Sequence, residues 1–185
     1  MSKNLSLYSI DSFLILDNEG SRLYAKYYSQ DEEFKTVKLQ KSFESKLFTK
    51  TTKQNFEILI FENKLIIYKE IADIIIYIIS GLEENEIYLY DLLSSFKDTL
   101  NNITNGGIDK KSILENYDKV VITIDELIDN GIILETESSA LNQRTSNTPT
   151  NETPSLKNID LSEKGLFNAF NFARGKIAER LQQGL

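Results

Sequence analysis

The side chains that could do chemistry in this chain are carboxylates, lysines, tyrosines and hydroxyls, because the sequence contains no Cys and no His. It therefore lacks thiolate nucleophiles and disulfides, and also the commonest general base and transition-metal ligand. The nearest approach to a carboxylate cluster is Asp125, Glu126 and Asp129. Buried carboxylates can transfer protons, but these sit on the outer side of a helix that buries Ile124 and Leu127, which favours a solvated face. We predict no catalytic residue, no metal site and no cofactor, and expect the protein not to be an enzyme.

Two further motifs have simple structural explanations. Asn18-Glu19-Gly20 is typical of a hairpin turn, since no phosphate-binding glycine motif, Walker lysine or spaced EF-hand acids surround it. Lys110-Lys111 is the only doubled basic pair, and it favours a surface position over a lipid site. The net charge of −7 has the wrong sign for a general binder of phosphate backbones. We expect neither a nucleic acid nor a small-molecule substrate as partner.

The elements that would position these residues begin with a β-hairpin. Residues 7–16 are β-branched and apolar, 17–20 form a turn cluster, and 21–28 alternate. The alternation predicts Leu23, Ala25 and Tyr27 on one face, with Arg22, Tyr24, Lys26 and Tyr28 on the other. Tyr27 is expected in the core, whereas Tyr24 and Tyr28 are either covered by a helix or exposed for a partner.

A helix and three strands are expected next. Residues 31–50 carry acidic residues at the start and an apolar stripe at Leu39, Phe43 and Leu47. The strands are predicted at Phe56–Phe61, Leu65–Tyr68 and Ile74–Ile79, with a tight turn at Asn63-Lys64. The third is almost wholly apolar, which is typical of a central strand buried on both faces.

Two amphipathic helices follow the strands. The first has an apolar stripe at Leu89, Leu92, Leu93, Phe96, Leu100 and Ile103, and it ends at Asn105-Gly106-Gly107. Asp109 can cap the second, whose stripe is Ile113, Tyr117, Val120, Ile124 and Leu127. That helix is expected to end at Asn130-Gly131, and residues 132–134 close the domain.

This order, β-β-α-β-β-β-α-α, predicts an α+β fold in which helices cover a five-stranded antiparallel sheet. The domain would span residues 1–136, and residues 137–158 are polar enough to predict a flexible linker. Residues 159–185 predict an amphipathic helix with a capping box at Asp160 and Glu163. Its apolar side supplies the candidate partner-binding residues Phe167, Phe170, Ile177 and Leu181.

Targeting signals are not evident in the sequence. Residues 1–5 lack the apolar region of a signal peptide, and the longest apolar run, residues 71–82, is shorter than the roughly 20 residues that span a bilayer. We expect a cytoplasmic protein.

Several strings in this order resemble the zeta subunits of the coatomer (COPI) coat, fungal type. They are the hairpin 14–28, the strands 57–62 and 65–70, the helix start 82–86, the segments 115–118, 124–126 and 129–136, and the tail 180–185. More distantly, the layout resembles the small (sigma) chains of clathrin adaptors and the longin fold. Some sigma chains contribute to a dileucine-signal pocket, but no such pocket can be matched here residue by residue.

The resemblance implies a longin-like domain embraced by the solenoid trunk of the coatomer gamma subunit. It also implies the remaining coatomer subunits as partners and indirect association with an Arf-family GTPase. The protein would be peripheral on Golgi membranes and COPI-coated vesicles, acting in retrograde Golgi-to-ER and intra-Golgi transport. The alternatives are a longin-type regulator of membrane fusion or trafficking outside a coat, which calls for a heptad coiled coil and an anchor, and a small-substrate enzyme.

Overall fold

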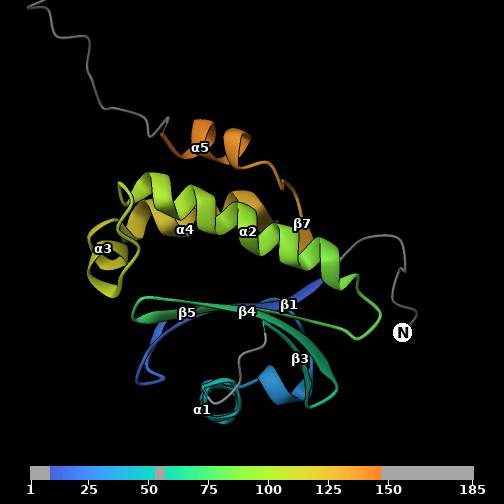
Figure 1. Cartoon of the computed structure of the whole chain (residues 1–185). Coiled ribbons are helices and arrows are strands. Elements are labelled where there is room, and N and C mark those ends of the chain that lie inside the picture. The colour runs from blue at the N-terminus through green and yellow to red at the C-terminus, as the bar shows by residue number, and fades with distance from the viewer. Residues whose placement is uncertain (1–8, 53–56, 147–185) are drawn as a thin grey trace, which may run out of the picture. The chain divides into compact units, whose positions relative to one another are not determined.

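A five-stranded antiparallel sheet lies at the centre of the computed structural model, which describes residues 9–52 and 57–146 (Figure 1). The strand order is β2-β1-β5-β4-β3. The strands are β1 Ile10–Asp17, β2 Arg22–Tyr27, β3 Ile58–Phe61, β4 Lys64–Ile71 and β5 Ile74–Ser80. The predicted sheet is confirmed, and so is the central strand, because every residue of β5 is buried.

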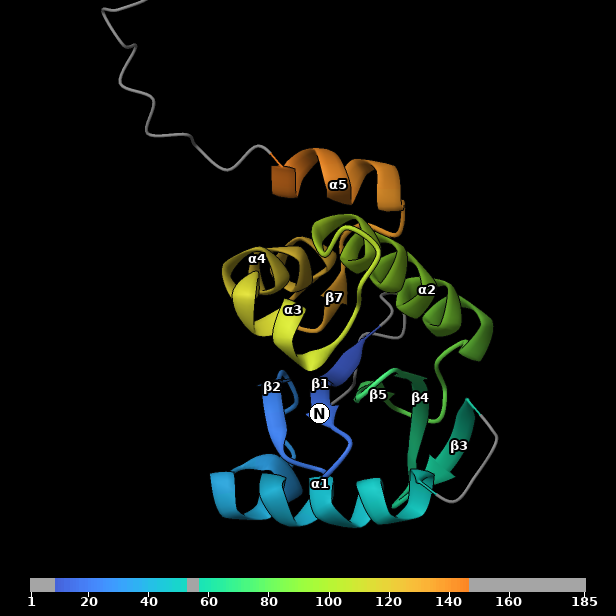
Figure 2. The same ribbon diagram turned by 60° about the vertical axis from the view of Figure 1, so that its left-hand side comes forward.

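Helices cover both faces of this sheet (Figures 1 and 2). Helix α1 (Val37–Thr51) lies on one face, whereas α2 (Glu86–Ile103) and α4 (Tyr117–Leu127) lie on the other. Because side chains alternate along a strand, β1 supplies both cores: Phe13 and Ile15 face α2 and α4, and Leu14 and Leu16 face α1.

The hairpin β1–β2 forms as predicted, but one of its faces differs from expectation. Leu23 packs with the α2/α4 core, next to the buried Tyr24, whereas Ala25 and Tyr27 pack with the α1 core. The cause is a register shift between Ile15 and Leu16, which pairs Ile15 with Tyr24 and Leu16 with Arg22. A bulge of this kind interrupts the strict alternation of side chains.

The helix predicted over residues 31–50 is divided in the structure. A 3₁₀ turn, Glu32–Phe34, buries Phe34, and α1 begins only after Thr36, whose hydroxyl accepts the N–H of Leu39. Phe43 and Leu47 are buried as expected, but the side chain of Leu39 is 45% exposed. The prediction that Leu39 belongs to the buried stripe is therefore wrong, because Phe34 fills the core ahead of the helix.

The turn between β3 and β4 lies one residue earlier than predicted. Glu62 and Asn63 have positive φ angles of 46° and 60°, and Lys64 already pairs with Phe61 as the first residue of β4. Two consecutive left-handed residues are typical of a two-residue hairpin loop. Strand β4 also extends to Ile71, beyond the predicted end at Tyr68.

Helix α2 buries its predicted stripe from Leu89 to Leu100 and leaves Ile103 half-buried, whereas the next predicted helix is divided into two. Asp109 caps α3 (Lys110–Glu115) through a reciprocal capping box with Ser112. The chain then leaves helical geometry at Asn116 (φ −116°, ψ 28°) before α4 begins. Tyr117 consequently lies at a helix start and is 39% exposed instead of buried.

The folded region continues past the boundary predicted at residue 136. After the two-residue strands β6 (Ile128–Asp129) and β7 (Ile132–Ile133), helix α5 (Ser138–Ser146) packs against α2 and α4. Leu141 and Thr145 of α5 are buried. A flexible linker over 137–158 is thus wrong for the residues of α5, since this polar helix needs only one buried face. Residues 147–185, including the predicted tail helix, lie outside the described residues.

Candidate interaction surfaces

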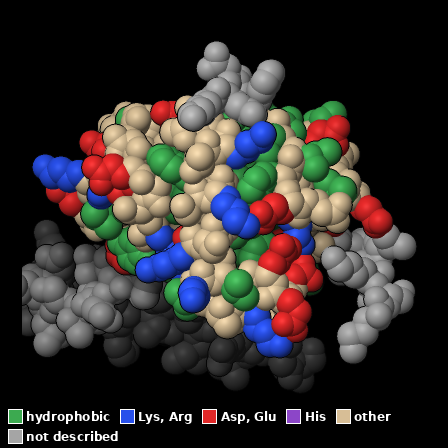
Figure 3. All heavy atoms as spheres, turned by 90° about the horizontal axis from the view of Figure 1, so that it is seen from below, with side chains coloured by type: hydrophobic (Ala, Val, Ile, Leu, Met, Phe, Trp, Pro, Cys, Tyr) green, Lys and Arg blue, Asp and Glu red, His purple; other side chains and the backbone are tan. Residues whose placement is uncertain are grey.

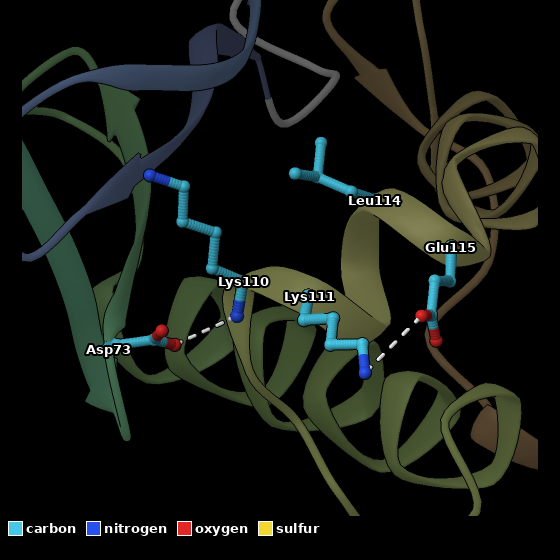
Figure 4. A pocket seen from close by; sticks show the side chains of 5 residues that line it. All are labelled: Asp73, Lys110, Lys111, Leu114 and Glu115. Atoms are coloured by element: carbon cyan, nitrogen blue, oxygen red, sulfur yellow. Dashed lines mark hydrogen bonds and ion pairs between the residues drawn. The ribbon is translucent and has the colours of Figure 1, made fainter.

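A hollow of about 450 Å³ lies where α3 meets the end of the sheet (Figure 4). The side chains that line it are Asp73, Lys110, Lys111, Leu114 and Glu115. The Lys111 ammonium lies 3.8 Å from Glu115, and the carboxylate of Asp73 accepts the backbone N–H of Lys110 at 2.8 Å. Leu114 is 52% exposed, so the hollow offers an apolar contact rather than a reactive pair.

Asp17 connects this hollow to the first hairpin. The carboxylate is fully buried, and it accepts the Lys110 ammonium at 2.8 Å and the N–H groups of Glu19 and Ser21 at 3.0 and 2.7 Å. Burial alone would raise the pKa of Asp17, but these hydrogen bonds outweigh it and hold the pKa below its ordinary value. Lys110 is therefore a structural cation, which agrees with its interpretation as part of a surface pair.

The second buried carboxylate, Glu44 of α1, fixes that helix to the sheet. Arg22 donates to it through Nη2 at 2.5 Å and Nε at 3.0 Å, and the Tyr27 hydroxyl donates at 2.7 Å. Burial, followed by the hydrogen bond to Glu44, raises the pKa of Tyr27. Arg22, Tyr27 and Glu44 therefore bind one another and have a structural role.

A buried lysine is the charged group that sequence reasoning missed. Lys64 lies 2.9 Å from Asp11, 2.6 Å from Asp31 and 3.4 Å from Glu33, with its ammonium 5.5 Å from the centre of the Phe34 ring. Burial opposes its charge, but the hydrogen bonds to Asp31 and Asp11 outweigh this and raise the pKa of Lys64. Asp11 and Asp31 are far from Lys64 in the sequence, so no local pattern indicates these ion pairs. The sequence predicts Lys64 only as a residue of a tight turn.

The carboxylates Asp125, Glu126 and Asp129 do lie on an outer face. Asp125 accepts Lys26 at 2.6 Å and Glu126 accepts Arg144 at 3.2 Å, in exposed ion pairs. Within residues 9–52 and 57–146, no group of three or more Asp or Glu side chains could hold a metal ion. In the same part of the chain, no helix is long and apolar enough to cross a membrane.

The two hairpin tyrosines whose position was open belong to the core side of the molecule. Tyr24 is 8% exposed and contacts the rings of Phe13 and Tyr117, and Tyr28 packs partly buried against the same core. They are covered by helix rather than presented to a partner. The predicted partner-binding residues Phe167, Phe170, Ile177 and Leu181 lie outside the described residues.

Exposed apolar side chains form the most evident candidate surface for a partner. Among the residues that the structure describes, strand β3 pairs with β4 alone, and its Ile58 and Ile60 are 42% and 68% exposed. Because Tyr68 N–H donates to the Glu57 carbonyl, hydrogen-bonded pairs alternate so that Ile58 and Ile60 turn their backbone groups toward the free edge. Ile87, in the first turn of α2, is 75% exposed.

Tyr90 connects helix α2, which carries Ile87, to the start of strand β3, which carries Ile58 and Ile60. Leu59 and Phe61 pack with the α1 core, so Ile58 and Ile60 face the side of the sheet that carries α2. Tyr90, one turn after Ile87, lies against the ion pair of Glu57 and Lys69 at the start of β3. An apolar surface beside an open sheet edge is typical of a protein–protein contact.

Comparison with known proteins agrees with this architecture. The family model of the clathrin adaptor complex small chain matches residues 9–151. The coatomer subunit zeta of Saccharomyces cerevisiae is 50% identical over 98% of this chain and 99% of its own length. The probable coatomer subunit zeta-A of Dictyostelium discoideum is 46% identical over 75% of this chain and 80% of its own length. The human coatomer subunit zeta-1 is 39% identical over 71% of this chain and 73% of its own length.

A structural comparison points to the same fold. A chain in a homology model of the full-length AP-3 complex in a stretched open conformation superposes with a TM-score of 0.59. It covers 74% of this chain and 91% of its own length at 17% sequence identity. At that identity the likeness concerns the fold alone.

Proposed function

This chain belongs to the zeta-subunit family of coatomer, within the clathrin adaptor complex small chains, and on that premise we propose that it pairs with the gamma subunit of its coat. Members of this family are structural coat subunits rather than enzymes, and the coat role applies to this chain. The solenoid trunk of gamma would embrace the domain, and the remaining coatomer subunits would assemble around that pair.

The exposed isoleucines of β3 and α2 are the observation that carries the proposal of gamma pairing. Burying one exposed Ile side chain contributes about 1.5–3 kcal/mol, so Ile58, Ile60 and Ile87 together would contribute several kcal/mol to the contact. Their exposed fractions, 42%, 68% and 75%, mean that the isolated chain leaves this area in water. A permanent partner removes it, as is usual for obligate interfaces.

The transport role follows from coat membership and is part of the same proposal. The assembled coat would act in retrograde Golgi-to-ER and intra-Golgi transport, with this chain cytoplasmic and peripheral on Golgi membranes and COPI-coated vesicles. Its association with an Arf-family GTPase would be indirect, through the larger subunits.

The C-terminal segment 159–185 supplies a second proposed contact. Its apolar positions, Phe167, Phe170, Ile177 and Leu181, are spaced for one helix face and would dock on another subunit of the coat. Deletion from Lys157 onward, or replacement of both phenylalanines by Ser, should leave gamma pairing largely intact and weaken assembly of the larger coat. Unchanged assembly and membrane recruitment in both variants would remove the tail from the proposal.

The test of gamma pairing is co-purification of the full chain with a gamma subunit. The double substitution Ile60→Asp with Ile87→Asp should abolish a stable complex in size-exclusion chromatography, because it places two charges in an apolar contact. Circular dichroism of the variant should stay native, since both side chains are exposed in the isolated chain.

A matched control uses the opposite face of the sheet. Val37 and Leu39 of α1 are 59% and 45% exposed, and replacing both by Asp should leave the complex intact. Loss of the complex in this control alone would place the interface on α1 and overturn the assignment to β3 and α2. Absence of any complex with the unaltered chain would overturn gamma pairing itself.

A further inference from the structure

Helix α1 presents a basic outer face in an otherwise acidic protein. It carries four lysines, Lys38, Lys41, Lys46 and Lys50, and all of them are exposed. Its single acidic residue, Glu44, points inward to Arg22. The whole chain, by contrast, has a net charge of −7.

Most of the positive charge on this face is uncompensated. Lys46 pairs with Glu62 at 2.9 Å, but Lys38, Lys41 and Lys50 have no ion-pair partner among residues 9–52 and 57–146. Figure 3 views the molecule from the side of α1, where blue side chains lie across the face with green hydrophobic and red acidic ones among them. The face therefore attracts anions.

From these charges we infer that the outer face of α1 docks on the anionic headgroups of a phospholipid membrane. The basic residues of the helix are all lysines, whereas protein interfaces are enriched in Arg and depleted in Lys. Lysine acts as a compact point charge without the geometric demands of a guanidinium, which suits a fluid array of lipid phosphates. The exposed Val37 and Leu39 stand beside the lysines and can contact the interfacial region.

The acidity of the rest of the chain does not cancel this attraction. The Debye length at physiological ionic strength is about 8 Å, and packed layers of secondary structure are separated by about 10 Å. The carboxylates of α4, such as Asp125, lie beyond the sheet from α1 (Figure 2). Helix α1 and the sheet lie between these carboxylates and a membrane that touches α1. At this distance salt screens the repulsion between the carboxylates and the lipid phosphates.

A hollow lies beside the helix. It measures about 690 Å³ and opens between the β1–β2 turn and α1. Its lining includes Arg22 and Glu44, which bind each other, and Lys41, whose charge is free to meet a headgroup. Each lysine near an anionic surface strengthens binding by roughly a factor of five. A few lysines give one chain only weak membrane binding. This contact would orient the protein with α1 toward the lipid. In an assembled coat it would add avidity to the membrane contacts of the other subunits.

The test is co-sedimentation of the full chain with vesicles of phosphatidylcholine alone, or with about one third phosphatidylserine. The variant Lys38→Gln, Lys41→Gln, Lys50→Gln keeps helix propensity and should bind the anionic vesicles at least about tenfold more weakly than the unaltered chain. The control variant Lys97→Gln, Lys111→Gln, Lys119→Gln removes the same charge from α2, α3 and α4. It should bind nearly as the unaltered chain does.

The unaltered chain should not bind neutral vesicles, and its binding to anionic vesicles should weaken as the salt concentration is raised. Equal binding to both kinds of vesicle, or equal losses in the two lysine variants, would overturn the inference. So would an α1 variant that keeps vesicle binding and instead loses a protein partner, since the face would then be a protein contact. Because the assay uses the chain without gamma, its failure would leave gamma pairing untouched.

Discussion

Replacing Glu44 by Ala should be among the most damaging single changes that leave the apolar core intact. The Glu44 side chain is 4% exposed and that of Arg22 is 23% exposed. Removing one partner of a fully buried pair costs about 3–5 kcal/mol, and the partial exposure of Arg22 reduces this to about 2–3 kcal/mol. The loss includes the acceptor of the Tyr27 hydroxyl, which donates to Glu44 at 2.7 Å.

The assay for this prediction is reversible denaturation in urea, with a thermal melt beside it. For a folded region of this size, a loss of 2–3 kcal/mol lowers Tm by about 6–12 °C. Glu44→Gln should lose less than Glu44→Ala, because the amide oxygen still accepts one hydrogen bond. The m-value should not change, since the extent of the folded surface stays the same.

The control is the exposed pair of Lys46 and Glu62, whose side chains are 58% and 35% exposed. Glu62→Ala should change the free energy of unfolding by no more than about 0.5 kcal/mol. If Glu44→Ala were no more costly than Glu62→Ala, the reasoning that a buried carboxylate fixes α1 to the sheet would be refuted.

Three further changes test the packing and the charges. With no His in the sequence, Tm should stay level between about pH 6 and 9. Tm should fall in acid, because the lowered pKa of Asp17 stabilises the fold only above the unfolded pKa of about 4. Tm should fall again between pH 10 and about 12, because burial raises the pKa of Tyr77 to about 12 and ionisation of the tyrosine in this range favours the unfolded chain. A Tm that shifts between pH 6 and 9 would contradict this. Gly131→Ala should cost at least about 1–3 kcal/mol in denaturant melts, since φ is +85° and the new Cβ would lie 2.7 Å from a backbone oxygen, whereas Gly81→Ala meets nothing within 4 Å and should be nearly neutral. Phe96→Asp should unfold the domain, because the ring is completely buried and an unpaired carboxylate there costs several kcal/mol against a total of about 5–15; native circular dichroism would refute the assigned stripe of α2.

Local patterns in the sequence were sufficient for the main elements. The apolar run of β5 predicts a strand buried on both faces, and the stripe from Leu89 to Leu100 predicts the helix that covers the sheet. Asp109 predicts a helix start that the structure shows as a capping box. Each of these signals lies within one element, so a single sequence is enough to read it. The strings that resemble coatomer zeta subunits likewise identified the family.

Tertiary structure decided which side chains are covered and how charges are paired. The bulge that turns Leu23 to the α2 side depends on the register between β1 and β2, and the exposure of Leu39 depends on Phe34 filling the core first. Lys64 meets Asp11 across 53 positions of sequence, and α5 is ordered by its packing on α2 and α4 although its own sequence is polar. None of these follows from periodicity, because a repeat within one segment carries no information about its neighbour in space. The basic face of α1 is of the same kind: its lysines are visible in the sequence, but only the inward turn of Glu44 to Arg22 leaves the outer face of the helix without an acidic residue of its own.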